Sequence, residues 1–242
     1  VAARWYDGVS VNRVQDNYVV QWGDADGEDA AKAKPLPQGL AVVPESQYVT
    51  LPFRVIEMAS ATQTVAEIVN DAARPKLARG QADAYVFPTQ ALLGWPLASD
   101  DQNNFWPIHC YGMVGVGRDM SPNTGTGAEL YTVIGHAPRH LDRNIALVGR
   151  VIEGIEHLSS LPRGTGALGF YESEAERVPI TSVRVVSAME SDKSLPGFEY
   201  LSTESESFAK YADARANRRD AFFIRPAGGA DICNIPVPVR RK

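Results

Sequence analysis

The second half of the chain consists of short apolar runs separated by glycine-rich turns, and this pattern restricts the fold more than any other feature. The runs span residues 113–116, 130–134, 145–151 and 183–186. Runs this short are typical of β-strands, because a helix needs ten or more residues to present a periodic apolar face. The pattern predicts a mainly β fold built as an antiparallel barrel.

The first part of the chain predicts two more strands and then an insertion. Apolar and polar residues alternate over residues 9–21, with a polar turn at Gln15-Asp16-Asn17, and a Gly- and Asp-rich loop follows. Residues 28–109 combine a connector rich in Ala, Lys and Pro, a β-like stretch at 47–58 and a helix at 64–73. That helix is predicted from the capping box of Thr64 and Glu67. We therefore expect an α/β insertion.

Two helical segments are predicted toward the C-terminus. The first covers residues 153–161, and the second begins at a capping box of Thr203 and Glu206 and runs to Arg219. The predicted organisation is one domain over residues 1–187, interrupted by the insertion, with a C-terminal extension over 188–242 packed on the barrel.

Composition and local motifs exclude several classes of function. The formal charge of −5 provides no basic field for nucleic acid, and no apolar run approaches the length of a membrane span. The glycines of 164–169 match a dinucleotide-binding spacing but lack the flanking strand and helix. Pro138 between His136 and His140 prevents the helix that would join them at a metal. We expect no metal and no cofactor.

Three ordered blocks resemble the cyclophilin-type peptidyl-prolyl cis-trans isomerase family. The blocks are 5–24, with its Arg-Val strand and Gln-x-Gly-Asp strand, 112–131, with its Pro-Asn turn, and 140–154. The resemblance implies an eight-stranded antiparallel barrel with capping helices. It covers about residues 1–27 and 110–187, and the two strands and the helix that open the family's domain are expected to be missing from this chain.

The resemblance also implies which residues do the chemistry. Arg13 stands at the family's catalytic arginine, and Gln21 at the residue that orients it and contacts the substrate backbone. An arginine suits the task because it stays charged and can donate a hydrogen bond to the prolyl nitrogen of a twisted amide. The substrate-binding positions are Tyr18, Val19, Gly117, Arg118, Glu129, Tyr131, His140 and Leu141.

Three departures from the family pattern affect the expected activity. Glu129 replaces the usual Gln and adds a charge that could pair with Arg13 or Arg118, Tyr18 and Tyr131 replace Phe, and Ile145 replaces a frequent His. We expect modest isomerase activity with an altered preference for the residue before proline.

The implied function is acceleration of X-Pro bond rotation in proline-containing polypeptides during protein folding. The alternative is a non-catalytic peptide-binding or scaffold module with the same groove, and a hydrolase is a distant third. Cys110 and Cys233 leave open a single disulfide or two buried thiols. The length, acidity and cysteines resemble exported bacterial members and favour a periplasmic location, with the cytoplasm as the alternative. The oligomeric state is open.

Overall fold

The computed structural model describes residues 1–27, 29, 31–49, 89–100, 102, 104–189 and 195–242. The chain divides into two compact units, and each unit combines segments that are distant in the sequence. The first contains Val1–Tyr48 and His109–Pro196, and the second contains Val49–Ile108 and Gly197–Lys242. Within the predicted insertion at 28–109, the β-like stretch at 47–58 lies outside the described residues except for 47–49, and the helix at 64–73 lies wholly outside them.

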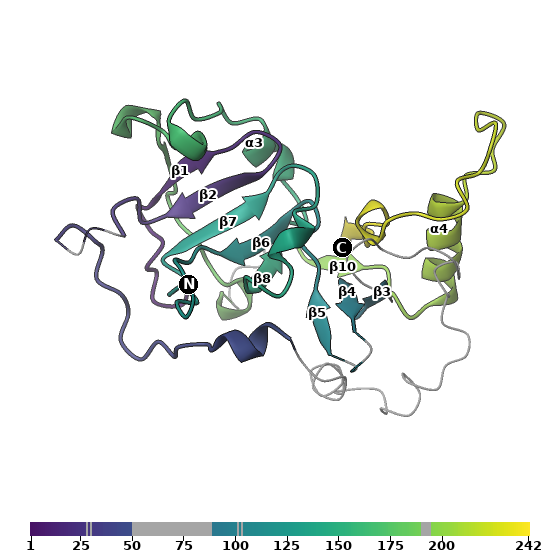
Figure 1. Ribbon diagram of the computed structural model, residues 1–242, viewed down its shortest axis with the longest axis horizontal. Coiled ribbons are helices and arrows are strands. Elements are labelled where there is room, and N and C mark those ends of the chain that lie inside the picture. Colours follow the sequence, from purple (N-terminus) through teal and green to yellow (C-terminus); the bar gives the residue numbers. More distant parts are fainter. Residues whose placement is uncertain (28, 30, 50–88, 101, 103, 190–194) are drawn as a thin grey trace. The chain divides into compact units, whose positions relative to one another are not determined.

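The first unit is organised around one antiparallel sheet with the strand order β8-β6-β7-β2-β1-β9 (Figure 1). Its strands are β1 (Ser10–Val14), β2 (Val19–Gly23), β6 (Met113–Val116), β7 (Glu129–Val133), β8 (Leu147–Arg150) and β9 (Val178–Pro179). The mainly β fold is therefore confirmed, and five of these strands, all but β9, lie within two residues of the predicted strands.

The sheet departs from the expected barrel in two respects. It has six strands, and among the described residues its outer strands β8 and β9 do not pair with each other, so no closed eight-stranded barrel forms. Strand β9 has two residues, one of them Pro179, which has no N–H to extend a ladder. The strand predicted at 183–186 is instead irregular and leads into a 3₁₀ turn, although Val183 packs against the core.

Two apolar clusters stabilise this unit. The first contains Trp5, Tyr6, Val9, Val116 and Leu130. The second contains Val11, Val14, Val20, Ile134 and Tyr171, and residues of helix α3 (Ile155–Ser159) and its flanks pack against it. Because the strands contribute to both clusters, the sheet is held in one register by burial of its apolar side chains.

Short 3₁₀ turns connect the strands of this unit. They lie at Glu45–Tyr48, Arg139–Leu141, Ala167–Gly169, Glu174–Glu176 and Val186–Ala188. The segment 164–169 is thus a loop with a 3₁₀ turn, and Gly169 has a φ of +80°, a conformation that favours glycine.

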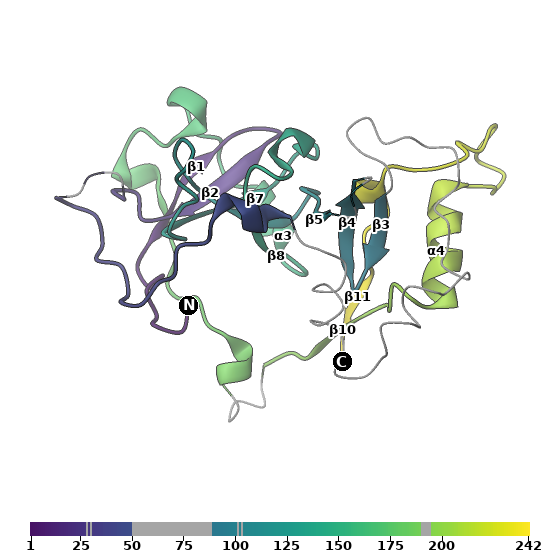
Figure 2. The same cartoon turned by 60° about the horizontal axis from the view of Figure 1, so that its bottom comes forward.

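The second unit joins the insertion and the C-terminal extension in one core. Strands β3 (Thr89–Leu92), β4 (Trp95–Ser99) and β5 (Phe105–Pro107) form one sheet, while β10 (Phe198–Tyr200) pairs with β11 (Val239–Arg241). Helix α4 (Glu206–Ala216) lies alongside β3, as Figure 2 shows, and Ala91 of β3 packs against the cluster that contains Phe208 and Ala212 of the helix. A further 3₁₀ turn, Ile232–Asn234, precedes β11.

Helix α4 begins two residues later than the capping box predicted. Ser205, not Thr203, is its N-cap, and the Ser205 side chain accepts a hydrogen bond from the Phe208 N–H. Thr203 is buried, and its Oγ1 accepts the Gly94 N–H at 3.1 Å, while Glu204 accepts the Leu93 N–H at 2.7 Å. Thr203, the predicted capping residue, therefore accepts a backbone N–H of the β3–β4 turn in the same unit.

Two further observations concern the chain as a whole. Both cysteines of the sequence, Cys110 and Cys233, are disulfide-bonded. Within the described part of the chain, no helix has the length and apolar character that crossing a bilayer would require.

Candidate functional site

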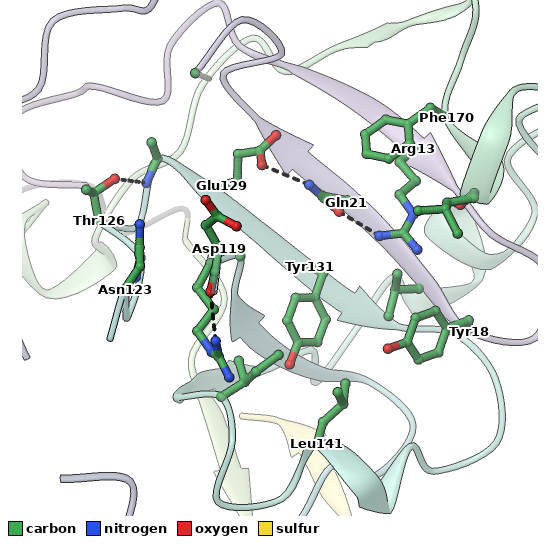
Figure 3. A pocket seen from close by; sticks show the side chains of 18 residues that line it. Arg13, Tyr18, Gln21, Asp119, Asn123, Thr126, Glu129, Tyr131, Leu141 and Phe170 are labelled. Atoms are coloured by element: carbon green, nitrogen blue, oxygen red, sulfur yellow. Dashed lines mark hydrogen bonds between the residues drawn. The ribbon is translucent and has the colours of Figure 1, made fainter. Parts of the chain in front are cut away.

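A cavity of about 490 Å³ opens on the sheet of the first unit (Figure 3). Nine of the ten residues predicted for the site line it: Arg13, Tyr18, Val19, Gln21, Gly117, Arg118, Glu129, Tyr131 and Leu141. The tenth, His140, stands just outside the lining. Its exposed ring lies nearly parallel to that of Tyr18, at a centroid distance of 6.2 Å and an interplanar angle of 15°.

A β-bulge places Arg13 in this cavity. The β1–β2 ladder pairs Val11 with Trp22 and then Arg13 with Gln21, so one extra residue, Asn12, is accommodated on β1. In a regular ladder without the bulge, Asn12 would lie opposite Gln21 and Arg13 would point toward the other face. The bulge therefore re-aims the arginine.

The same register aligns a row of residues across four strands. Arg13 of β1 pairs with Gln21 of β2, Gln21 pairs with Tyr131 of β7, and Tyr131 pairs with Gly115 of β6. Directly paired residues share a face, with Cβ atoms about 4.5–5.5 Å apart in antiparallel sheets. Residues separated by more than a hundred positions thus become immediate neighbours.

The guanidinium of Arg13 is held from three directions. Its Nε donates to the Leu168 carbonyl at 2.7 Å, Nη1 donates to Gln21 Oε1 at 3.1 Å, and Nη2 donates to Gln15 Oε1. The guanidinium carbon also lies 5.3 Å from the centroid of the Phe170 ring. Burial lowers the pKa of Arg13 from its ordinary value, and the nearby Glu129 opposes this change.

A carboxylate orients the Gln21 amide. Glu129 Oε2 accepts from Gln21 Nε2 at 2.9 Å, and Glu129 Oε1 accepts from Asn12 Nδ2 at 2.9 Å. Because the amide nitrogen donates to Glu129, the amide oxygen faces the donor on Arg13 (Figure 3). The charge of Glu129 thus contributes to the position of Arg13 through Gln21.

Apolar side chains form the floor of the cavity. Tyr131, Val19, Leu141 and Ile145 lie there, and Figure 3 shows the Tyr131 ring between the Arg13–Gln21 pair and Leu141. Tyr131 is 5% exposed, and burial raises the pKa of its hydroxyl. The ring therefore offers an uncharged, mainly apolar surface to a ligand.

The rim opposite Arg13 is formed by residues 117–128. Arg118 donates to the carbonyls of Asn144 and Asp119, at 2.8 and 2.7 Å. Gly125 has a φ of +77°, and a Cβ there would lie 2.2 Å from the Gly117 carbonyl oxygen, so the loop needs glycine at this position to close on β6. These contacts hold the rim against the sheet.

The loop that carries Leu168 and Phe170 also lines the cavity, although neither residue was predicted for the site. The glycine-rich spacing of 164–169, which resembles a dinucleotide-binding motif, is the sequence signal that marks this loop. A glycine-rich loop of this kind approaches another backbone closely: a Cβ on Gly169 would lie 2.9 Å from the Val14 carbonyl oxygen beside Arg13. Three or more His, Cys, Asp or Glu side chains in a metal-binding arrangement are not found anywhere in the described residues.

Comparison with known proteins identifies the family and the fold of the chain. The family described as cyclophilin type peptidyl-prolyl cis-trans isomerase/CLD matches residues 1–188. The chain belongs to this family. The crystal structure of the cyclophilin AquaCyp293 from Hirschia baltica has the same fold, with a TM-score of 0.65 and 21% identity over 100% of this chain and 79% of that chain. No curated protein matches the sequence significantly.

Within this cyclophilin-type domain, the structure shows the contacts of the residues that depart from the family pattern. Glu129 accepts hydrogen bonds from two amides, Tyr131 is paired with a glycine, and Ile145 adds apolar surface to the cavity. Each change is accommodated without leaving the lining. The cavity keeps Arg13, oriented by Gln21, beside an apolar floor.

Proposed function

We propose that the chain catalyses cis-trans isomerisation of X-Pro peptide bonds, with Arg13 as the catalytic residue. The observation that supports this proposal is the position of the Arg13 guanidinium, which hydrogen bonds to Leu168 and Gln21 fix beside the apolar floor made by Tyr131 and Leu141. The same cavity offers a surface for a prolyl ring and a donor for its nitrogen.

The reaction requires stabilisation of a twisted amide. Rotation about the C–N bond meets a barrier of about 18–20 kcal/mol, because resonance is lost in the twisted state. The prolyl nitrogen then regains a lone pair and accepts a hydrogen bond that it does not accept in the planar state. A donor placed at that nitrogen therefore stabilises the transition state more than the ground state.

Arg13 retains donors for this purpose. A guanidinium has five N–H groups, and three of them bond to Leu168, Gln21 and Gln15. Two remain, one each on Nη1 and Nη2, without a partner among the described residues. Since the three contacts fix the plane of the group, the two remaining N–H groups have a defined direction and lose little entropy when a substrate binds.

The apolar floor supports discrimination for proline. The ring carbons of proline would pack on Tyr131, Leu141 and Val19, while Gln21 and the backbone of the 117–118 segment lie where the peptide on either side would pass. No covalent intermediate and no cofactor are needed in this mechanism, because binding energy alone favours the twisted state.

A protease-coupled assay with a proline-containing tetrapeptide tests the proposal. We expect the chain to increase the isomerisation rate above the uncatalysed value, and Arg13→Ala to abolish most of that increase. Binding of the peptide without acceleration would contradict the catalytic proposal and favour the non-catalytic peptide-binding module.

We also propose that the protein works in an oxidising compartment such as the periplasm. The disulfide-bonded state of Cys110 and Cys233 supports this location, since disulfides persist where thiols are not continually reduced. Thiol alkylation of the protein in intact cells before lysis tests the proposal, and two alkylated cysteines would contradict it.

A further inference from the structure

A buried polar cluster lies directly behind the floor of the cavity. His109 Nε2 is 2.8 Å from the Tyr131 hydroxyl, and His109 Nδ1 is 2.9 Å from Asp142 Oδ1. Asp142 Oδ2 in turn accepts from Arg139 Nε at 2.7 Å. The four residues are 0–7% exposed, so water does not compete for these contacts.

The partners of His109 define which ring nitrogen carries the proton. Asp142 is paired with Arg139, and a carboxylate only accepts hydrogen bonds. The Asp142 Oδ1 atom also accepts the backbone N–H of His109 at 2.9 Å. Nδ1 therefore carries a proton, because only a donor can face the Asp142 carboxylate. In the tautomer that this contact selects, Nε2 accepts the hydrogen bond of the Tyr131 hydroxyl.

The orientation of the two rings supports a directed hydrogen bond. The His109 and Tyr131 rings are within 12° of parallel, and their centroids are 6.2 Å apart. Because the hydroxyl oxygen and Nε2 are only 2.8 Å apart, the two rings are displaced along their planes and do not lie directly over each other. The hydroxyl end of Tyr131 therefore faces the Nε2 edge of His109.

The neighbouring strand gives the tyrosine room to reach His109. A Cβ on Gly115, its partner on β6, would lie 2.3 Å from both Cζ and the hydroxyl oxygen of Tyr131. Any other residue at 115 would displace the ring from its present position. Gly115 and His109 therefore act on the same part of Tyr131: Gly115 leaves space for the ring, and His109 forms a hydrogen bond with its hydroxyl.

We propose that His109, oriented by Asp142, is a positioning residue that keeps the Tyr131 hydroxyl turned away from the cavity. Tyr131 then presents its ring to the prolyl group, and its hydroxyl does not donate a hydrogen bond into the cavity. A polar group free at the floor would recruit water or bond to the wrong part of a peptide, and proline binding would weaken. This inference rests on the proposed function in naming a prolyl ring as the ligand.

Two substitutions of His109 separate its two contacts. The Asn side chain places its amide near the position of Nδ1 and loses the contact with Tyr131, whereas the Gln side chain reaches the position of Nε2. We expect His109→Asn to raise KM for a prolyl tetrapeptide about three- to tenfold, the range for one lost neutral hydrogen bond, with little change in kcat. His109→Gln should raise KM less.

The decisive measurement is the same substitution in a Tyr131→Phe background. Without the hydroxyl, His109 has no group on Tyr131 to hold in place. The KM of the double variant, divided by the KM of Tyr131→Phe alone, should therefore be about one. An equal KM ratio in both backgrounds, or a loss confined to kcat, would overturn the proposal. Thermal unfolding of each variant establishes that the compared proteins are folded.

A spectroscopic measurement on the unmodified protein is independent of folding of the variants. ¹⁵N NMR of the His109 ring should show a protonated Nδ1 and an unprotonated Nε2, and the opposite tautomer would overturn the inference. If the protein binds the peptide without isomerising it, the proposed function fails. The dissociation constant then replaces KM in the same comparison, so the role of His109 is still decided.

Discussion

Arg13 of β1 and Gln21 of β2 face each other directly in the antiparallel ladder, and Arg13 Nη1 donates to Gln21 Oε1 at 3.1 Å. The pairing exists because a bulge at Asn12 shifts the register of β1 by one residue. The bulge in β1 therefore determines how the guanidinium of Arg13 is oriented.

Replacing Arg13 by Ala should lower kcat/KM by two or more orders of magnitude. A charged hydrogen bond made only in the transition state contributes about 1.5–3 kcal/mol, and loss of the cation's field adds to it. The measurement is the protease-coupled assay on a prolyl tetrapeptide. Arg184→Ala is the matched control, because Arg184 bonds to Asp7 away from the cavity. Equal activity of wild type and Arg13→Ala would end the catalytic assignment.

Glu129 and Gln21 should act on catalysis as one unit. Glu129→Ala releases the Gln21 amide, and Gln21→Ala removes the contact to Arg13, so each should lower kcat/KM by less than Arg13→Ala does. In a double-mutant cycle we expect a coupling of about 0.5–3 kcal/mol, since both substitutions act through the same guanidinium. Additive effects of the two substitutions would show that Glu129 does not work through Gln21.

Tyr131 should make stability fall at high pH. Burial raises the pKa of this phenol in the folded state, so the stability it contributes is complete below its ordinary pKa of about 10 and is lost as the pH rises above that value. The free energy of unfolding should fall more steeply above pH 10 in wild type than in Tyr131→Phe, by up to about 1.4 kcal/mol per pH unit.

Urea unfolding at pH values from about 8 to about 11 measures this difference, because that range includes the ordinary phenol pKa of about 10. Tyr200→Phe is the control, because Tyr200 is 48% exposed. Parallel pH profiles of wild type and Tyr131→Phe would contradict the prediction.

Phe208→Ala should destabilise the second unit without changing the site. Phe208 is 2% exposed in the cluster with Ala212, Ile235 and Val237, and truncation of a buried Phe costs about 3–5 kcal/mol. Every residue lining the cavity belongs to the first unit, so turnover of the tetrapeptide should be unchanged in the folded variant.

Urea unfolding measures the loss of stability in Phe208→Ala, and the tetrapeptide assay on the folded variant measures its turnover. Phe222→Ala, at a side chain that is 84% exposed, should change stability by less than about 0.5 kcal/mol. A proportionate loss of turnover in folded Phe208→Ala would show that the site depends on the second unit.

Much of the sheet was predictable because its information is local. The alternation of residues 9–21 and the short runs at 113–116 and 130–134 specify strands through a period of two, and Gly or Asx residues mark the turns. The ordered blocks around Arg13, Gln21 and Tyr131 identified the family and named nine of the residues that line the cavity.

Only the tertiary structure decided how those residues work together. Cross-strand pairing brings Arg13, Gln21, Tyr131 and Gly115 into one row, and a pattern of neighbouring residues does not encode which strands pair or where a bulge shifts them. The N-cap of α4 at Ser205 was likewise set by a distant partner, since the Thr203 hydroxyl accepts the Gly94 N–H.

The cluster behind the floor shows the limit most clearly. His109, Arg139 and Asp142 look like ordinary polar residues in the sequence, and only burial against Tyr131 makes their hydrogen bonds obligatory. The residue pattern predicted five strands of the sheet and the family, and it pointed to Arg13 as the catalytic candidate. The folded chain determined the direction in which each polar group points, because that direction depends on partners that are distant along the chain and close only in space.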